Sequence, residues 1–422
     1  MNVILRYIQN ISKEKALVFL FFLGSIIPAF NYVADRIGIQ WFYLSVVLLF
    51  SSLYLIYSKK INFTFLTAND KFAKYVFISY SIFILTSIYS VFSAKNVTES
   101  LVVLSHYITI YLIFFVTISL SKKINNFKGF ILTLLYLFLV VEIIFVLIPI
   151  IEDIEVNSLL MRSNRYVGLM SNINITAFSL LYKLPVIFYF LEKSKNNFNL
   201  ILNFFIFFSV IFCVLILGSR ASFIALAFIF FFRIIFYILY YKRRFKKQIL
   251  GLTIVITLAA LLNLKFSSSS NFLDRAAKIS LVNNDSSINQ RINYYKSSVE
   301  IFKENPFFGI GVGNWKFESI NKNRFNITGY IVPFVAHNDF LQILNENGLF
   351  GFLSYGLIFL FVAFIILKNT KSLLYIYIGL FFGVYFIDSM LNFPLVRPVS
   401  QLHFILFLTL FFNLNEHGAE TK

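Results

Sequence analysis

The sequence predicts an all-α, polytopic integral membrane protein, and three features lead to that fold class. Of its 422 residues, 59% are hydrophobic, 19% are aromatic and only 13% are charged, whereas soluble globular domains carry roughly 25% charged residues. A water-soluble fold of this length has too little interior to bury so many apolar side chains. Apolar runs of about 20 residues, the length that one helix needs to cross a bilayer, also recur along the chain.

Twelve segments have the length and apolar composition of transmembrane helices. They lie near residues 16–33, 39–57, 72–92, 101–120, 129–150, 167–191, 199–218, 221–241, 249–264, 348–367, 372–391 and 395–414. The ninth is short and the twelfth contains Arg397. We therefore expect a single membrane domain over residues 1–422, with about twelve transmembrane helices and a helical extracytoplasmic loop over residues 265–336.

The basic residues predict the orientation of this domain. The formal net charge is +18, and 20 of the 37 Lys and Arg residues fall on the side that carries both termini, against 6 in the short connections on the other side. Because Lys and Arg are retained on the cytoplasmic side, both termini are expected to be cytoplasmic and the long loop to lie outside. Topology thus explains the positive charge, and no nucleic-acid partner is expected.

The long loop has a helical period of its own. From Ile288, apolar side chains recur at Ile292, Tyr295, Val299 and Phe302, and spacings of three and four residues form one stripe along a helix. A proline four residues later prevents the helix from continuing far. We expect an amphipathic helix of roughly four turns here, with its stripe facing the bundle or the lipid boundary.

A glycine-rich segment follows that helix. The sequence FFGIGVGNW, residues 307–315, superficially resembles a dinucleotide-binding loop. No strand precedes it and no βαβ unit surrounds it, so the pattern indicates a flexible turn.

The segment before the tenth span predicts a short helix with a histidine at its start. In VAHNDFLQILNENGLFG, residues 335–351, Asn338 or Asp339 can cap a helix that Gly348 ends. A helix N-terminus favours neutral imidazole, so His337 would keep a lone pair able to accept a proton. A histidine that only caps or hydrogen-bonds the loop fits the same spacing, and which group is the general base stays open.

Several charges beside apolar runs need individual explanations, because an Arg near mid-membrane costs roughly 2.5 to 3.5 kcal/mol. In GSRASF, Arg220 opens the eighth span and points toward the outer interface, although snorkelling to lipid phosphate is the alternative. Arg165 precedes the sixth span. Glu142, Asp388 and Arg397 are further candidates, with pairing between helices as the structural alternative, and Arg233 is expected to snorkel.

Polar residues inside the sixth span suggest a hydrated cavity at its outer end. Asn172 and Asn174 lie in this outer part, and Lys183 beside Pro185 is placed to reach the same cavity. Hydrogen bonding between helices explains the asparagines equally well.

The outer-face residues share one chemistry. Arg165, Arg220, Arg291 and His337 all map to the outer side, and arginine binds diphosphate well because its planar fork donates two hydrogen bonds and stays charged. An anionic lipid diphosphate is therefore the expected ligand. No His, Cys or carboxylate spacing suggests a metal site, and no cofactor is expected.

At this point the sequence resembles the O-antigen ligase and O-antigen polymerase superfamily of bacterial envelopes. The residues that carry the resemblance are RYVGLMSNIN, GSRASF, NQRINYYKSSVEIFKENPFFGIGVGNW and HNDFLQILNENGLFG, within about residues 165–397. The His-Asn-Asp segment after Pro-x-x-Gly-x-Gly is the most specific part. Where the family often has Asn-Pro-Asn, this chain has Asn172, Ile173 and Asn174.

The resemblance implies a metal-independent, inverting glycosyltransferase in the bacterial inner membrane, with its active site facing the periplasm. It would transfer a glycan from undecaprenyl diphosphate to a hydroxyl. Carried over by motif, the family's arginines fall on Arg165, Arg220 and Arg291 and its histidine on His337. In this mechanism Arg220 and Arg291 stabilise the leaving diphosphate, and His337 is the candidate base, with Asp339 as a second candidate or an orienting partner.

Three functions remain in competition. The first is a ligase that joins the glycan to lipid A core. The second is an O-antigen or exopolysaccharide polymerase that uses a lipid-linked repeat unit as acceptor. The third, from another class, is a transporter of an anionic or lipidic solute, because arginines at hydrated span ends suit that role as well.

Overall fold

The computed structural model describes residues 12–28, 37–59, 71–156, 164–240, 245–266, 273, 286–323 and 334–417. Within these ranges the chain forms α-helices and short 3-10 helices and no strand. Both chain termini lie outside the described residues. Their expected cytoplasmic location therefore stays a prediction.

The expected all-α, polytopic membrane class is confirmed. Eight helices of the described chain are long and apolar enough to cross a membrane, and two more apolar stretches, Leu250–Lys265 and Pro398–Leu414, are shorter. The helices of the bundle are α2 (Lys13–Leu23), α3 (Gly38–Tyr57), α4 (Lys71–Ser90), α5 (Val97–Ser121), α6 (Phe127–Glu155), α7 (Ile173–Lys193), α8 (Asn197–Leu217), α9 (Arg220–Tyr240), α10 (Phe245–Phe266), α15 (Gly348–Lys368), α16 (Leu373–Leu391) and α17 (Pro398–His417). Short 3-10 helices η2 (Val91–Ser93), η3 (Asn164–Tyr166), η4 (Gly168–Met170) and η5 (Pro394–Val396) connect some of them.

The first expected span, residues 16–33, is shorter than predicted. Helix α2 ends at Leu23 after 11 residues. Beyond it the Ser25 hydroxyl donates to the Phe22 carbonyl (2.7 Å) and the Gln40 amide to the Ile27 carbonyl (2.7 Å). Because side chains satisfy these carbonyls, the backbone can leave the helix without exposing polar groups to lipid.

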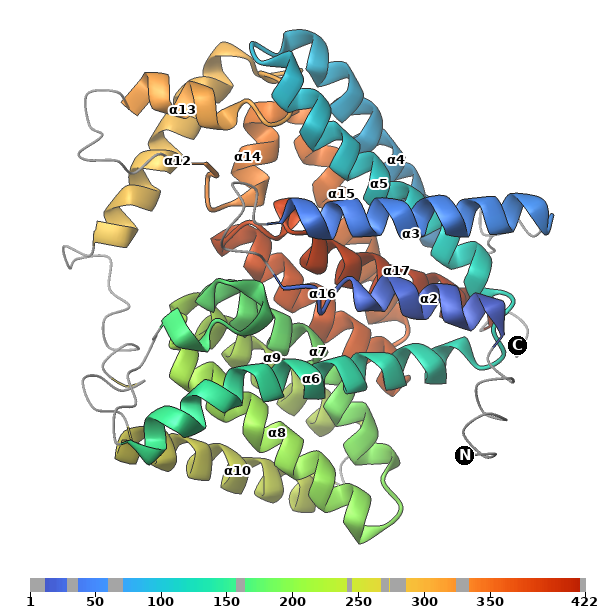
Figure 1. The fold of residues 1–422 in the computed structure, drawn as a ribbon, viewed down its shortest axis with the longest axis vertical. Coiled ribbons are helices and arrows are strands. Elements are labelled where there is room, and N and C mark those ends of the chain that lie inside the picture. Colours follow the sequence, from blue (N-terminus) through green and yellow to red (C-terminus); the bar gives the residue numbers. More distant parts are fainter. Residues whose placement is uncertain are drawn as a thin grey trace.

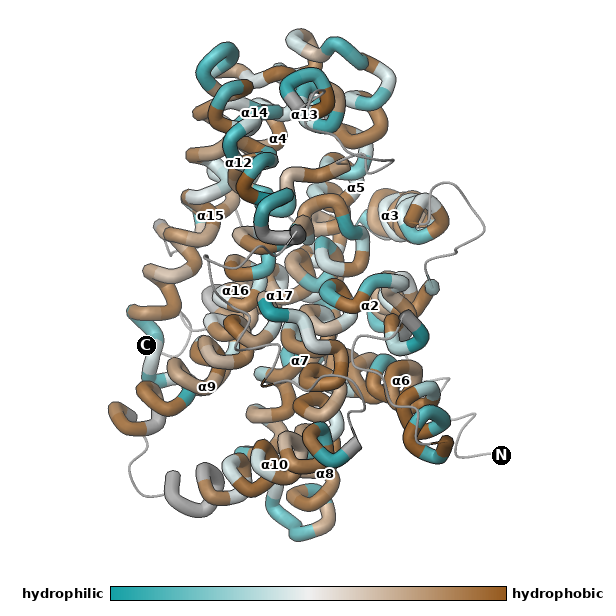
Figure 2. Tube along the Cα trace, turned by 90° about the vertical axis from the view of Figure 1, so that its left-hand side faces the viewer, coloured by the Kyte–Doolittle hydropathy of each residue, from teal (hydrophilic) through white to brown (hydrophobic). Residues whose placement is uncertain are grey.

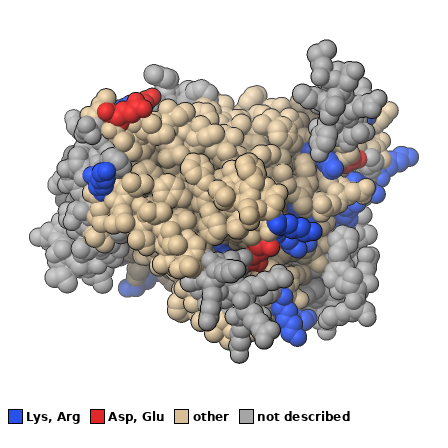
Figure 3. Space-filling model, turned by 90° about the horizontal axis from the view of Figure 1, so that it is seen from below, with Lys and Arg blue, Asp and Glu red and all other residues tan. Residues whose placement is uncertain are grey.

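Helix α7 lies at the centre of the bundle. Buried residues make up 83% of its apolar window, against 39% in α3 and in α4. It packs against α6, α8, α9 and α16, and Figure 1 shows the outer helices arranged around these elements. The face seen in Figure 3 carries few described charges, and most of these lie near its margins, as expected for a surface in contact with lipid.

The long loop contains the predicted amphipathic helix and a second, shorter helix that was not predicted. Helix α12 (Ser286–Glu304) and helix α13 (Trp315–Asn323) contact each other and α14 (Asp339–Glu346), and α14 in turn contacts α15 and α16. We call α12, α13 and α14 the cap. The cap gathers at one end of the molecule (Figure 1), where more of the trace is hydrophilic than in α9 and α15 (Figure 2).

The glycine-rich segment forms the expected turn, but it is buried. Gly309, Gly311 and Gly313 all have left-handed φ angles. A Cβ atom on Gly309 would lie 2.4 Å from the backbone of Glu346, so the glycines allow the chain to pass directly against the end of α14. The segment is a packed connection between the cap and the bundle, and the expected flexible turn is wrong in that respect.

Candidate functional site at the junction of cap and bundle

The site is built around the start of α14. The Asn338 side chain accepts a hydrogen bond from the Leu341 backbone N–H (3.0 Å) and caps the helix, so Asn338 is the cap of the two candidates that the sequence offers. His337 directly precedes this N-cap residue and has a φ angle of +54°. A non-glycine residue in the left-handed region is uncommon, although histidine adopts it more readily than most. This turn points the imidazole toward α12 instead of along α14.

Two aromatic rings contact the imidazole, and a third aromatic residue binds the His337 backbone. The Tyr294 ring from α12 stacks with it (centroid distance 6.4 Å, 9°), and the Phe393 ring meets it edge-on (5.0 Å, 78°). The Tyr295 hydroxyl donates to the His337 carbonyl (3.3 Å). The imidazole Nδ1 atom is buried and makes no hydrogen bond to any described residue. One ring nitrogen thus makes no polar contact with the described part of the chain.

Two arginines lie beside this histidine. The Arg291 Nη1 atom donates to the Leu391 carbonyl at the end of α16 (2.8 Å), and the Arg397 guanidinium lies 4.8 Å from the Phe393 ring centroid. Burial and then the positive charges of Arg291 and Arg397 lower the pKa of His337 from 6.5 to about 4. The imidazole is therefore neutral at physiological pH.

Asp339 is locked within the same junction. Its side chain is 1% exposed, and its Oδ2 atom accepts from the Leu395 backbone N–H (3.0 Å). Burial raises the pKa of this carboxyl well above its ordinary value, although the hydrogen bonds from Leu395 and Ser389 oppose the shift. Asp339 thus ties the start of α14 to η5. This contact fits the role of an orienting partner for His337 better than the role of a second candidate base.

The remaining outer arginines have different surroundings. Arg220 is the first residue of α9 and is partly exposed; α9 packs against α16, the helix whose end receives Arg291. Arg165 forms ion pairs with Glu152 and Asp153 of α6. Since α6 runs past the predicted end of its span, these two carboxylates meet Arg165 and offset its charge. Arg165 is therefore an anchor between α6 and α7 in this structure.

The polar residues of the sixth span do not share one cavity. Asn172 caps α7 by accepting from the Asn174 N–H (2.9 Å) and the Ile175 N–H (3.3 Å). Lys183 lies 11 residues further along the helix, which is about 16 Å. Its ammonium group donates to both Glu142 carboxylate oxygens (2.9 and 3.0 Å). The expectation that Lys183 reaches the outer cavity is wrong, because its partner lies deeper in the bundle.

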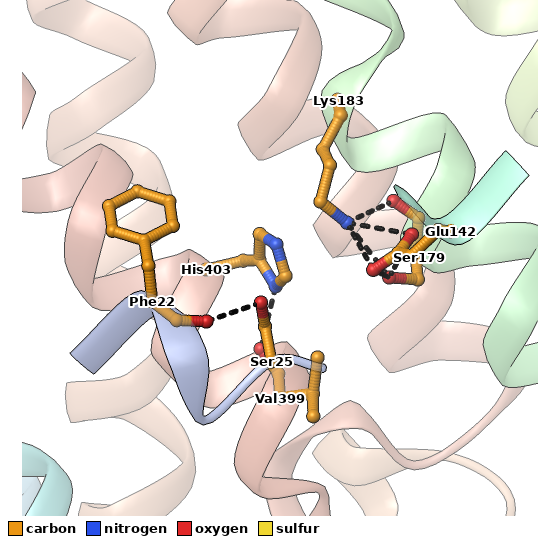
Figure 4. Close-up of polar contacts among 7 residues, drawn as sticks. All are labelled: Phe22, Ser25, Glu142, Ser179, Lys183, Val399 and His403. Carbon is orange, nitrogen blue, oxygen red and sulfur yellow. Dashed lines mark hydrogen bonds and ion pairs between the residues drawn. The ribbon is translucent and has the colours of Figure 1, made fainter. Parts of the chain in front are cut away.

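Figure 4 shows this buried charge cluster. The Lys183 ammonium also donates to the Ser179 carbonyl and hydroxyl (3.0 Å each), and the His403 ring from α17 lies beside it. The His403 Nδ1 atom lies 2.7 Å from the Val399 carbonyl. Arg233 is likewise buried, with its guanidinium 3.4 Å from the Phe188 ring centroid, so the expectation that it snorkels is wrong.

Sequence reasoning missed the residues that enclose His337. Tyr294 and Tyr295 follow Arg291 by three and four positions, so helical spacing places all three on one face of α12. That signal was present in the sequence. Phe393 and the Leu391 carbonyl carried no comparable signal, because they reach the site through the packing of α16 against α14.

Comparison with known proteins relates part of the chain to a family. Residues 205–356 match the family model described as O-antigen ligase. This part of the chain is similar to the O-antigen ligase family. The O-antigen ligase segment runs from α8 into α15 and contains Arg220, Arg291 and His337, whereas Arg165 and Arg397 lie outside it. No curated protein compared with the chain matches it. The resemblance to the O-antigen ligase superfamily is thereby confirmed for this segment.

Proposed function

We propose that this protein is a metal-independent membrane glycosyltransferase that moves a glycan from undecaprenyl diphosphate to an acceptor hydroxyl on the periplasmic face of the inner membrane. The observation that carries the proposal is the convergence of Arg291, Arg397 and His337 at one junction, with the imidazole Nδ1 unoccupied by any described hydrogen-bond partner. The O-antigen ligase segment that contains two of these residues supports the same chemistry.

The arginines suit the leaving group. In a single displacement the bond from the sugar C1 to the diphosphate oxygen breaks while the acceptor oxygen bonds to C1 from the opposite face. Negative charge then grows on the departing diphosphate, and fixed guanidinium donors stabilise it most in the transition state. Arg291 is fixed by the Leu391 carbonyl and Arg397 by the Phe393 ring. Arg220 is proposed as a third donor, from the start of α9.

The histidine suits the acceptor. The attacking hydroxyl loses a proton as the new bond forms, and we assign the acceptance of this proton to the His337 imidazole. A pKa of about 4 makes the imidazole a weak base in the empty site. A bound diphosphate would offset the positive charges of Arg291 and Arg397, and this change would raise the pKa of His337. The donor thereby activates the base that the acceptor needs.

Transfer by the purified protein tests this proposal. In liposomes with a lipid-linked glycan donor and an acceptor glycolipid, we expect His337→Asn to lower the rate about a hundredfold or more. Asparagine also tolerates the left-handed backbone, so the substitution removes the base without forcing the turn to change. Arg291→Ala should cause a loss of about a hundredfold as well.

A matched control comes from the same helix. Lys296 is exposed on α12, so Lys296→Ala removes one positive charge from the cap and should leave the rate within about twofold. If His337→Asn and Arg291→Ala retain activity comparable with Lys296→Ala, the proposed site is wrong. Solute flux without glycan transfer in the same liposomes would favour the transporter.

Ligase and polymerase differ in the acceptor, and the cellular product separates them. We propose the ligase, which uses lipid A core. Deletion of the gene should then leave long polymer on its lipid carrier and bare core lipopolysaccharide. A core that carries a single repeat unit would instead identify the polymerase.

A further inference from the structure

A groove runs along the bundle directly below the cap. It lies between α9, α15 and α16 and encloses about 490 Å³, a volume typical of small-molecule sites. Every residue that lines it is apolar or glycine, including Phe228 and Phe232 of α9 and Phe386 of α16. A site without any polar lining can hold only hydrocarbon.

Glycines make the space. A Cβ atom on Gly383 would lie 2.1 Å from the Phe228 ring, whereas a Cβ atom on Gly356 would meet nothing within 4 Å. The absence of a Cβ atom at Gly383 therefore leaves room for the Phe228 ring in the groove wall, and Gly356 faces the empty part of the groove. Leu360 and Leu367 along its edge are 48% and 64% exposed. The groove is open to the surface that faces lipid, so a lipid chain can enter from the side.

The upper end of the groove meets the proposed catalytic site. Phe359 and Phe386 in its wall both pack against Phe340 (centroid distances 5.8 and 5.2 Å). Phe340 is the second residue of α14 and lies three positions after His337. On α16, the wall residue Ile387 lies one helical turn before Leu391, whose carbonyl holds Arg291. A molecule with its charged head at these arginines would thus have its tail at the mouth of the groove.

We propose that this groove binds the isoprenoid chain of the donor, over the units nearest the diphosphate. The inference rests on the proposed function, since it assigns the tail of the same substrate. The position below the diphosphate site favours this occupant over the acyl chain of a phospholipid, and the aromatic walls offer flat faces to methyl-branched, unsaturated units. Holding the tail fixes the sugar C1 carbon before the acceptor arrives.

Filling the groove tests this assignment. Gly356→Phe places a ring in the empty part of the groove and replaces a helix-interior glycine with a better helix former, so the fold should be retained. Gly356→Ala is the matched control, because its single methyl group leaves most of the space open. Two donors are compared: undecaprenyl diphosphate glycan and an analogue with a single isoprene unit that does not reach the residues around Gly356.

We expect Gly356→Phe to raise KM for the long-chain donor by about tenfold, a modest effect because the displaced chain is still in lipid. The value of kcat and the reaction of the short-chain donor should not change, and this second result shows that the variant is folded. Equal effects on both donors, or no effect on either, would overturn the groove assignment and leave the proposed function intact.

Photolabelling tests the groove assignment separately from the proposed glycosyltransferase function. A polyprenyl diphosphate with a photoreactive group in its second isoprene unit should label α9, α15 or α16 in the wild type and not in Gly356→Phe. This readout does not require transfer. A wild type that is labelled but transfers no glycan would refute the proposed function alone, whereas labelling of these helices only by a photoreactive phospholipid would refute the groove assignment.

Discussion

His337 combines a left-handed backbone with a partly buried, neutral imidazole. Backbone conformations of this kind are disfavoured unless the surroundings hold them, and they cluster at functional sites. Here the Asn338 cap follows, and the Tyr295 hydroxyl binds the His337 carbonyl. The fold therefore fixes the direction of one ring, and that direction decides which ligand the ring can meet.

The pH dependence of transfer should report the charge around this ring. Without donor, the pKa of His337 is lowered from 6.5 to about 4, and a bound diphosphate raises it again. Because only the neutral imidazole accepts a proton, activity is lost as pH falls through this pKa. We expect the acidic limb of kcat to lie at higher pH than the acidic limb of kcat/KM, measured between about pH 4 and pH 9.

The variant His337→Asn is the control for this pH profile. In His337→Asn the residual activity should lack the kcat limb, because the titrating group is gone. Coincident limbs in the wild type, or an unchanged limb in His337→Asn, would mean that another group accepts the proton.

At the scale of elements, hydrogen bonds at the end of α14 hold the parts of the cap and the glycine-rich turn together. The Glu346 Oε1 atom accepts from the Trp315 backbone N–H (3.2 Å) and the Gln342 amide (3.2 Å), and the Gly311 N–H donates to the Glu346 carbonyl (3.0 Å). Burial raises the pKa of this carboxyl from 4.5 to about 7, although hydrogen bonds from Gly313, Trp315 and Gln342 and the charge of Lys316 oppose the shift. One side chain thus joins α13, α14 and the glycine-rich turn.

Glu346→Gln should change how stability depends on pH. Between about pH 5 and pH 7 the folded wild type keeps this carboxyl protonated while the unfolded chain releases the proton, so rising pH favours unfolding by at most about 1.4 kcal/mol per unit. Glutamine does not titrate. The thermal midpoint of Glu346→Gln relative to wild type should therefore increase through this range and level off above it. A difference that is constant or decreases with pH would contradict this origin of the shift.

The molecule as a whole places an ion pair inside its membrane-embedded bundle. Lys183 and Glu142 are 0% and 4% exposed in their side chains, and they join α6 to the central helix α7. Charged residues in transmembrane segments are costly unless they pair. Removal of one partner leaves the other charge buried and alone, which typically costs about 3 to 5 kcal/mol.

A double-mutant cycle should detect this coupling. We expect Lys183→Met alone and Glu142→Leu alone to lower the thermal midpoint strongly, and the double variant to lie closer to the wild type than either single variant. Lys123→Met, at an exposed lysine, is the control for loss of a positive charge. Additive losses in the double variant would mean that the two groups do not stabilise the bundle as a pair.

How far the sequence predicts this molecule differs between the fold and the site. Most of the spans, helix α12 and the cap at Asn338 were predicted, because each depends on composition or spacing within about 20 neighbouring residues. Arg291 and His337 were identified as candidates in the same way. The prediction for Lys183 failed because its partner Glu142 is 41 positions away. The predicted length of the first span failed because a distant side chain, Gln40, binds the Ile27 carbonyl beyond the end of α2.

The sequence by itself determined the membrane class, most helices and the residue types able to bind a diphosphate, since these follow from local hydropathy, periodicity and charge. Only the tertiary structure decided that Arg397 joins Arg291 and His337, that Arg165 is held by α6, and that an apolar groove opens beneath the cap. Lipid does not select among apolar helix faces as water does, so the partners of each face are fixed by side-chain packing across the whole bundle.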